Sequence, residues 1–341
     1  MSRFRIDRRE FLRQITGTTV AISAASLAGP LATTAAAAEP GVRLLPRATI
    51  GLQLYSVRNL IAELGFGPVF EELSRLGFRK VEFAGYTSPA DPGITPAQIR
   101  RLLDDNGLEA VGSHRSLGDF RTRLSQELDI AEELGMKHLG TANAPTNDRT
   151  IAGYQAAAEE FNTWGEQAIA RGIKLYQHNH SIEFSFATDN PDVRLYDVFL
   201  EHTDPSLVWL EMDILWAFGG ARKYPRPGGA AGTLPRFNPV DYVLAHPERY
   251  PLFHVKDGVE TPDPNAGNSY IDVEFGAGVI PYAEFFSALR NRLAHIPLWE
   301  MDRAPETPPE QGGAFGAAER SIAEMIALTG DMRRTAPRGR P

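Results

Sequence analysis

The sequence has no cysteine among its 341 residues. Disulfide bonds, thiolate ligands and a cysteine nucleophile are therefore excluded, so side-chain ligands of a metal ion must come from histidine, aspartate or glutamate. Basic residues are also few, with 35 Lys and Arg against 43 Asp and Glu. Without the first 38 residues the balance is 30 to 41, a net charge of −11. Because an acidic surface repels phosphate backbones, this composition disfavours nucleic-acid binding.

The first 38 residues differ from the rest of the chain. Arg8-Arg9 are followed by an uncharged stretch rich in Ala, Thr, Ser and Gly, and residues 36–38 are all Ala. This order is typical of an export signal, and the paired arginines resemble the twin-arginine type, which delivers folded proteins. A membrane anchor is the alternative, but Gly17, Gly29 and Pro30 interrupt the stretch. We therefore predict a cleaved signal peptide over residues 1–38.

Export of this kind defines the expected location and partners. We expect the twin-arginine machinery to deliver the chain to the periplasm or the cell exterior, with no stable membrane insertion after cleavage. A homo-oligomer is compatible with the sequence. Residues 331–341 form a basic tail rich in Pro and Gly, which we expect to be disordered.

Between these ends, short apolar runs alternate with amphipathic stretches of helical spacing. The runs that predict strands begin near residues 50, 80, 110, 138, 172, 207, 251 and 296. Stretches of helical spacing follow each run, and one starts at Thr95-Pro96, a pair that suits a helix start. A Gly- and Pro-rich loop is expected over residues 219–239. The alternation predicts one α/β domain over residues 39–330, a closed (β/α)8 TIM barrel, rather than an open sheet with a Gly-rich phosphate loop.

Polar residues gather where the last four predicted strands end. Active sites of (β/α)8 barrels lie at the carboxyl ends of the strands. The residues at these ends are His178, His180 and Glu183, then Glu211 and Asp213, then His254, Lys256 and Asp257, then Glu300 and Asp302, with Gln53, Glu82 and His114 from earlier strands. Imidazole and carboxylate ligands suit a divalent cation. The pattern predicts a metal centre built across four strands.

Five stretches resemble the sugar isomerase/epimerase superfamily with the xylose isomerase-like barrel, which also includes endonuclease IV-type DNA repair enzymes. They are Ile50–Arg58, Tyr176–Phe184, Phe253–Gly258, Gly276–Ile280 and Trp299–Asp302. The resemblance covers about residues 50–328. It implies one divalent ion (Mn, Zn, Co or Mg) held by Glu183, Asp213, His254 and Glu300.

Two positions depart from the pattern of the superfamily. Many relatives end the fifth strand in Glu-Asn-His, whereas this chain has His178-Asn179-His180. An alignment places His178 on that glutamate, while Glu183 restores a carboxylate from the following loop. We favour Glu183 as the ligand, with His178 as the alternative. The second departure is Trp216, which stands where relatives carry the histidine that nucleases use for an additional metal ion.

The predicted centre suits proton abstraction next to the carbonyl of a keto sugar. A metal ion can bind adjacent carbonyl and hydroxyl oxygens and stabilise the resulting enediolate. The outcome is then epimerisation, isomerisation or, with a leaving group, the β-elimination of a 3-keto-glycoside lyase. Candidate catalytic residues are Glu183, Glu300, His178, His180 and Lys256, and candidate substrate contacts are His114, Trp216 and Asp257. An ion pair with a barrel carboxylate is the alternative role of Lys256.

A small carbohydrate is thus the expected partner. Export favours a free or oxidised sugar, such as a 3-keto-glycoside, over a phosphorylated one. An exported carbohydrate-binding barrel without catalysis is the alternative from another class. An endonuclease is a third interpretation, which the acidic composition and Trp216 both disfavour.

Overall fold

The computed structural model describes residues 41–225, 237–289 and 291–330, and these form a (β/α)8 barrel. Its eight parallel strands are β2 (Gly51–Gln53), β3 (Lys80–Phe83), β4 (Glu109–Ser113), β5 (His138–Thr141), β6 (Lys174–His178), β7 (Val208–Asp213), β8 (Leu252–Val255) and β11 (Ile296–Trp299). Seven neighbouring pairs form regular ladders, and β4 approaches β5 through a bridge between His114 and Gly140. The Arg115 N–H also donates to Gly140 O at 2.7 Å. The predicted fold class is confirmed.

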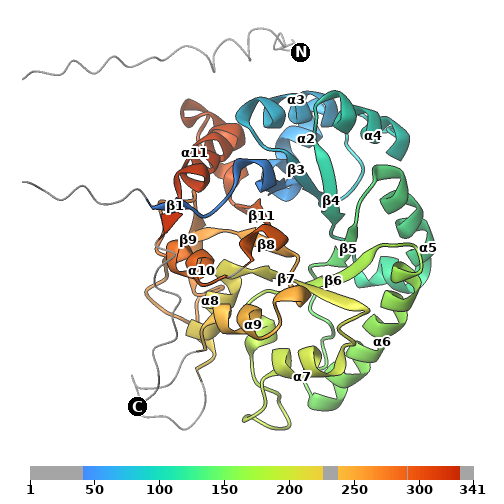
Figure 1. Ribbon diagram of the computed structural model, residues 1–341, viewed down its shortest axis with the longest axis vertical. Helices are drawn as coiled ribbons and strands as arrows, with labels where there is room; N and C mark the ends of the chain where they lie inside the picture. Colours follow the sequence, from blue (N-terminus) through green and yellow to red (C-terminus); the bar gives the residue numbers. More distant parts are fainter. Residues whose placement is uncertain (1–40, 226–236, 290, 331–341) are drawn as a thin grey trace, which may run out of the picture. The chain divides into compact units, whose positions relative to one another are not determined.

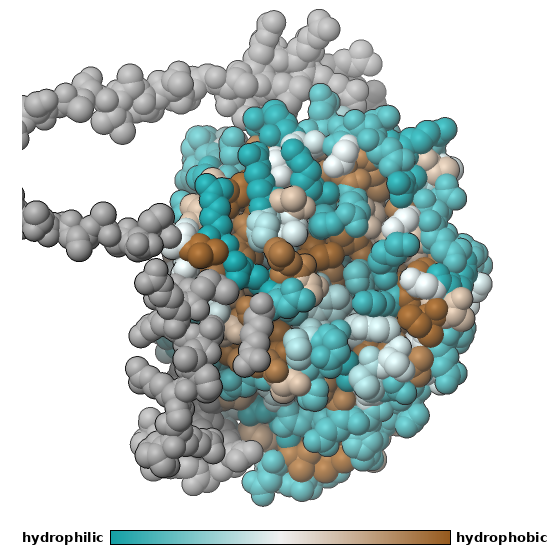
Figure 2. Space-filling model, viewed as in Figure 1, coloured by the Kyte–Doolittle hydropathy of each residue, from teal (hydrophilic) through white to brown (hydrophobic). Residues whose placement is uncertain are grey.

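Helices connect the strands and cover the outside of the sheet, as α3 to α7 do around β3 to β6 in Figure 1. The helices are α2 (Arg58–Leu64), α3 (Phe66–Leu76), α4 (Pro96–Asp105), α5 (Leu117–Leu134), α6 (Ile151–Ile169), α7 (Leu195–His202), α8 (Ile214–Lys223), α9 (Pro239–Ala245), α10 (Tyr282–Ala288) and α11 (Gly313–Ala327). Hydrophilic side chains cover most of the rim in Figure 2, with smaller hydrophobic patches between them. The start of α4 agrees with the prediction, since Thr95 caps it in a capping box with Gln98.

The predicted loop over residues 219–239 is wrong at its beginning, because residues 219–223 complete α8. The two glycines that suggested a loop serve close packing instead. A Cβ on Gly219 would lie 2.3 Å from Asn268 O, and one on Gly220 would lie 2.7 Å from Phe184 Cβ. Side chains at these positions would push α8 away from its neighbours. The glycines therefore bring α8 close to the loops at the carboxyl end of the barrel.

Two small antiparallel sheets lie outside the barrel ladder. Strands β9 (Asp257–Glu260) and β10 (Tyr270–Val273) form a hairpin directly after β8, where only a loop was expected. Strands β1 (Val42–Arg43) and β12 (Thr329–Gly330) pair the two ends of the described domain. The hairpin thus extends the wall of the barrel at the end where the polar residues lie.

The interior of the barrel changes character along its axis. Val111, Tyr176, Trp209, Leu252 and Leu298 form an apolar cluster separate from the larger core between sheet and helices. Successive residues of a strand face opposite sides, so the residues two positions further along share the interior face. These residues are charged or polar: Glu211 on β7, His254 on β8 and Glu300 directly after β11. We call the five residues the apolar plug, and it forms the base beneath the polar groups.

The predicted signal peptide over residues 1–38 and the basic tail over residues 331–341 lie outside the described residues. Among the described residues, none of the helices combines the length and apolar character needed to cross a membrane.

Candidate metal and catalytic site

Three of the predicted ligands converge at the carboxyl ends of β7, β8 and β11. Ligand atoms of Asp213, His254 and Glu300 all lie within 4.8 Å of one another, and all three side chains are buried. His254 Nδ1 lies 2.7 Å from Glu300 Oε2. Asp213 Oδ2 is buried and accepts no hydrogen bond. Two carboxylates and an imidazole, one carboxylate oxygen of which accepts no hydrogen bond, fit a divalent cation. We call this set the Asp-His-Glu group.

The orientation of Asp213 follows from its place at the start of α8. Its Oδ1 accepts the Trp216 N–H at 2.9 Å and so caps the helix. The cap directs Oδ2 away from the helix, toward Lys256 and His178. Burial raises the pKa of Asp213 to about 7, although Lys256 and His254 oppose that rise. Removal from water therefore makes its ionised form depend on a positive partner.

Lys256 supplies positive charge beside the Asp-His-Glu group. Its Nζ lies 2.9 Å from Glu300 Oε2, 3.3 Å from Asp213 Oδ2 and 3.0 Å from Asp302 Oδ2. Burial lowers the pKa of Lys256, but the three carboxylates outweigh burial and hold that pKa well above its usual value. The ammonium is therefore charged at neutral pH, and the predicted ion pair with barrel carboxylates is present.

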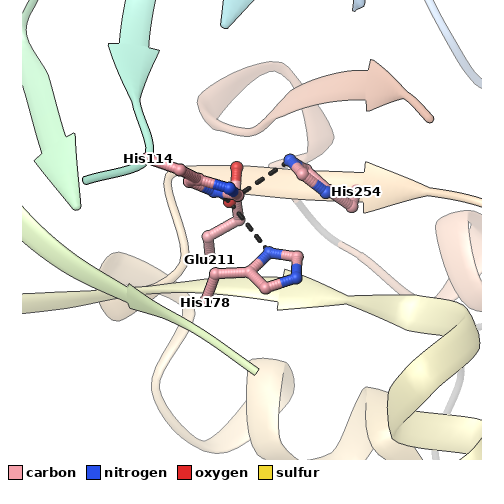
Figure 3. Close-up of side chains that lie close together, drawn as sticks. All are labelled: His114, His178, Glu211 and His254. Atoms are coloured by element: carbon pink, nitrogen blue, oxygen red, sulfur yellow. Dashed lines mark hydrogen bonds and ion pairs between the residues drawn. The ribbon is translucent and has the colours of Figure 1, made fainter. Parts of the chain in front are cut away.

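A second group lies beneath the first and shares His254 with it. Figure 3 shows His114, His178 and His254 pointing toward Glu211. The Glu211 Oε2 atom lies 2.8 Å from His114 Nε2, 3.0 Å from His178 Nδ1 and 3.3 Å from His254 Nε2. These ligand atoms also lie within 4.8 Å of one another. We call this set the His-Glu group.

Electrostatics differ sharply within the His-Glu group. Burial raises the pKa of Glu211, but the surrounding histidines outweigh burial and hold that pKa well below its usual value. Burial, together with the charge of His254, holds the pKa of His178 well below 6.5. Glu211 is thus a carboxylate at neutral pH, and His178 is a neutral imidazole.

The fifth-strand residues occupy three different environments. His178 Nε2 lies 3.9 Å from Asp213 Oδ2, at the edge of the Asp-His-Glu group. Glu183 belongs to neither group, because its Oε2 accepts the His180 N–H at 2.8 Å, while its Oε1 is buried without a partner. Burial raises the pKa of Glu183 to about 7. The structure therefore brings His178, but not Glu183, next to the predicted metal ligands.

His180 and Trp216 lie together near Lys256. The rings of His180 and Trp216 are stacked with centroids 6.4 Å apart, and Lys256 Nζ lies 4.6 Å from the centroid of the Trp216 ring. Burial lowers the pKa of His180 to about 4, and the charge of Lys256 adds to that shift. His180 is half-buried. It therefore offers a neutral imidazole at the mouth of the site.

The contacts of Asp257 are not those expected of a residue that binds substrate. Its carboxylate accepts N–H groups of Gly258 at 2.9 Å, Gly276 at 2.9 Å, Gly278 at 3.0 Å and Ile280 at 3.3 Å. Four backbone donors saturate both oxygens. Asp257 thus organises the loop after the β9–β10 hairpin rather than offering an acceptor to a ligand.

Sequence reasoning collected Glu82 and Glu211 as polar strand residues but gave neither a role. Both are fully buried. Glu82 accepts hydrogen bonds from Gln53 Nε2 at 2.6 Å and from the Tyr176 hydroxyl, and it lies 2.6 Å from His254 Nε2. The alternation of side chains along a strand could have identified Glu211, since it lies two residues before Asp213 and so shares its face of β7.

Comparisons with known proteins agree with the barrel fold. A family model described as "Xylose isomerase-like TIM barrel" matches residues 70–317. A sugar phosphate isomerase/epimerase from Parabacteroides distasonis has 22% identity and a TM-score of 0.62, over 86% of this chain and 96% of that chain. The probable 3-DHS dehydratase AsbF from Bacillus anthracis has 16% identity and a TM-score of 0.57, over 81% and 98%. IOLI protein with a binding zinc atom has 11% identity and a TM-score of 0.59, over 82% and 98%. No curated protein matches the sequence.

Proposed function

Since the chain belongs to the family of xylose isomerase-like TIM barrels, we propose that it is a divalent-metal-dependent isomerase or epimerase of a keto sugar. The observation that carries the proposal is the Asp-His-Glu group, in which Asp213 Oδ2 accepts no hydrogen bond and the charged Lys256 lies 3.3 Å from it. Structural neighbours with isomerase/epimerase and dehydratase names support the class of chemistry.

Four residues would hold the ion in this proposal: Asp213, His254 through Nδ1, Glu300 and His178 through Nε2. His178 replaces Glu183 as the fifth-strand ligand, because His178 Nε2 lies 3.9 Å from Asp213 Oδ2 whereas Glu183 lies in neither group. Two ligands that each lie about 2.0–2.2 Å from one ion can be that far apart. When bound, the ion would act as a Lewis acid that polarises the sugar carbonyl.

The surrounding residues supply proton transfer and orientation. The neutral His180 imidazole takes the proton from the carbon next to the carbonyl, since it is half-buried at the mouth, whereas His178 is only 2% exposed. Lys256 donates a hydrogen bond from Nζ to a sugar oxygen and keeps its proton at neutral pH. Glu300 is not the base in this proposal, because it would bind the ion and its Oε2 already lies 2.9 Å from Lys256 Nζ.

A 3-keto-glycoside lyase is the second candidate for the same site. Lys256 favours it, since a buried ammonium beside the reacting carbons could donate a proton to a departing oxygen. The dehydratase name of one structural neighbour also describes an elimination. Isomerisation and elimination share the first proton abstraction and differ in the next step: isomerisation returns a proton to a carbon, whereas elimination expels the oxygen substituent on the β-carbon.

The cations at the end of α8 support an unphosphorylated substrate. Arg222 donates to Ser269 O and to Thr261 O, each at 2.7 Å, and Lys223 donates to Gly267 O at 2.6 Å. Both side chains are thus engaged by the hairpin backbone. A phosphate group would have to break these contacts, whereas a neutral sugar leaves them intact.

Export remains part of the proposal. It rests on Arg8-Arg9 and the small residues that follow. Cell fractionation of the full chain and of an Arg8→Lys, Arg9→Lys double variant tests it. We expect the mature protein outside the cytoplasm for the wild type alone, and equal cytoplasmic retention of both proteins would contradict export.

The central test combines metal analysis with solvent isotope exchange. The protein, loaded with Mn²⁺, Zn²⁺, Co²⁺ or Mg²⁺, is incubated in D₂O with aldoses, ketoses and 3-keto-glycosides. Deuterium on a carbon next to the carbonyl is expected, and the product separates isomerase, epimerase and lyase. A Glu72→Gln variant on α3 is the control, because Glu72 pairs with Arg75 on the outside of the barrel.

Two outcomes would contradict the proposal. The first is a wild-type protein that binds none of the four ions. The second is tight sugar binding without deuterium incorporation, which would favour an exported carbohydrate-binding protein.

A further inference from the structure

Two fully buried carboxylates, Glu82 on β3 and Glu211 on β7, lie beneath the proposed metal ligands. Among the described residues, neither forms an ion pair with lysine or arginine, and their charged partners are histidines. Burial of a charge is costly unless the charge is well paired. The partners of these carboxylates therefore explain their presence in the barrel.

The contacts of His254 determine which of its ring nitrogens faces the proposed ion. Its Nε2 lies 2.6 Å from Glu82 Oε2, while its Nδ1 lies 2.7 Å from Glu300 Oε2. Glu82 is itself fixed by donors from Gln53 and Tyr176. Because Glu300 is a proposed ligand and Glu82 is not, Nδ1 is the nitrogen on the side of the ion. The contact with Glu82 holds the ring in that orientation.

Glu211 has the same relation to His178, with the two ring nitrogens exchanged. His178 Nδ1 lies 3.0 Å from Glu211 Oε2, and Nε2 lies on the side of Asp213. The contact with Glu211 therefore holds the ring with Nε2 toward the proposed ligand Asp213. Each carboxylate thus directs one nitrogen of one histidine toward the proposed ion site.

We propose that Glu82 and Glu211 are positioning residues, which fix the ring orientations of His254 and His178 so that both histidines can bind one ion. This inference rests on the proposed function. Carboxylate groups behind metal-bound histidines raise the basicity of the ligand and hold its ring in place. The arrangement makes the two carboxylates part of the affinity of the site, although neither contacts the ion.

The competing explanation is a second ion held by the His-Glu group. It would need His254 Nε2 as a ligand, yet the nearest oxygen to Nε2 is Glu82 Oε2 at 2.6 Å, closer than Glu211 Oε2 at 3.3 Å. That nitrogen is already engaged by Glu82. One ion per chain is therefore expected, and the number of bound ions distinguishes the two explanations.

The experiment compares Glu82→Gln and Glu211→Gln with the Glu72→Gln control. Metal affinity is measured by competition with a chromogenic chelator, bound ions per chain by elemental analysis, and the zinc-bound histidine nitrogens by ¹⁵N NMR of the Zn²⁺-loaded protein. Each of the two variants should bind the ion about 10- to 100-fold more weakly than wild type. The NMR signature should be specific: Glu211→Gln should change the ring signals of His178, and Glu82→Gln should change those of His254.

Several results would overturn the inference. Unchanged affinity and unchanged histidine ring signals in both folded variants would do so, as would two ions in wild type and one in Glu211→Gln. A general loss of folding would change every histidine signal together, so the residue-specific pattern separates positioning from a structural role. A wild-type protein that binds no ion contradicts the proposed function instead, and the ring contacts of His178 and His254 in the ion-free protein remain measurable by NMR.

Discussion

The same strands build two opposite environments inside the barrel. On β7 the apolar plug residue Trp209 is followed on the same face by Glu211 and Asp213, and on β8 Leu252 is followed by His254. Two residues further along the same strand, the interior thus changes from apolar to charged. At one end burial stabilises the fold, whereas at the other end burial is a cost that only correct pairing offsets.

This difference separates stability from function along the barrel axis. Burying a leucine side chain contributes about 1.5–3 kcal/mol, whereas breaking a buried ion pair costs about 3–5 kcal/mol. The apolar plug therefore supports the fold, and the rigid frame holds the charged groups in place. Changes in the two environments should have separable effects.

The largest expected effect is on metal binding, from Asp213→Asn. We expect metal affinity to fall by more than about 100-fold and activity to be lost. This loss of affinity is larger than the loss of about 10- to 100-fold expected for residues that only contact the ligands. Asparagine still caps α8, so the fold should be retained. Chelator competition and thermal unfolding check the two parts. An unchanged affinity would remove Asp213 from the proposed ligands.

The opposite result is expected from Leu298→Ala in the apolar plug. This change should lower the free energy of unfolding by about 2–5 kcal/mol through a cavity, while the metal affinity of the folded protein stays unchanged. Denaturant unfolding and chelator competition measure the two quantities. Leu293→Ala is the control, because Leu293 is 65% exposed and should change stability by less than about 0.5 kcal/mol. Weaker metal binding together with little loss of stability would contradict the separation of stability and metal binding along the barrel axis.

Glu183 tests the cost of burying a charge directly. Burial raises the pKa of Glu183 to about 7, so the folded state holds a proton that the unfolded state has released above its ordinary pKa. The carboxyl group therefore favours folding less as pH rises from about 4.5 to about 7. In chelator, the stability of Glu183→Gln relative to wild type should grow over this window, by up to about 3 kcal/mol.

Denaturant unfolding at pH 5, 6, 7 and 8 measures the Glu183 effect. If Glu183 is not a ligand, as proposed, adding the metal ion shifts both proteins equally. A stability difference that stays constant with pH would contradict the buried carboxyl. A difference that changes when metal is added would return Glu183 to the ligand set.

The smallest effect is expected from Trp216→Phe. The indole Nε1 is buried without a hydrogen-bond partner, and the ring lies beside Lys256. Phenylalanine keeps an aromatic face, so stability should change by less than about 1 kcal/mol. Thermal unfolding checks the stability, and calorimetric titration with the sugar checks the predicted substrate contact. Trp216 is buried in the large core, so a much larger loss of stability would show that its indole packs there in a way that phenylalanine cannot replace.

Much of the fold was predictable because its signals are local. Strand β7 showed an apolar run, and α4 showed its Thr95 cap, so neither required knowledge of distant residues. Local signals also misled at one place. Gly219 and Gly220 indicated a loop, yet they lie within α8, because close approach to other segments, not a turn, requires them.

The site was predictable only as a collection of strand ends. Asp213, His254 and Glu300 followed from their positions after apolar runs, and the structure brings them together. Glu183 was chosen for its carboxylate, but its backbone contact with His180 keeps it outside both groups. The hairpin of β9 and β10 was missed because its strands are short and its connection is rich in turn residues.

The sequence by itself determined the alternation of strands and helices, the end of the barrel that carries charge, and the residue types available to bind a metal. These depend on spacing between near neighbours. Tertiary structure alone decided which side chains meet: His254 and Glu82 are 172 residues apart yet share a hydrogen bond across the barrel. Strand register makes such pairs, because side chains on neighbouring strands of a closed sheet converge on one interior whatever their distance along the chain.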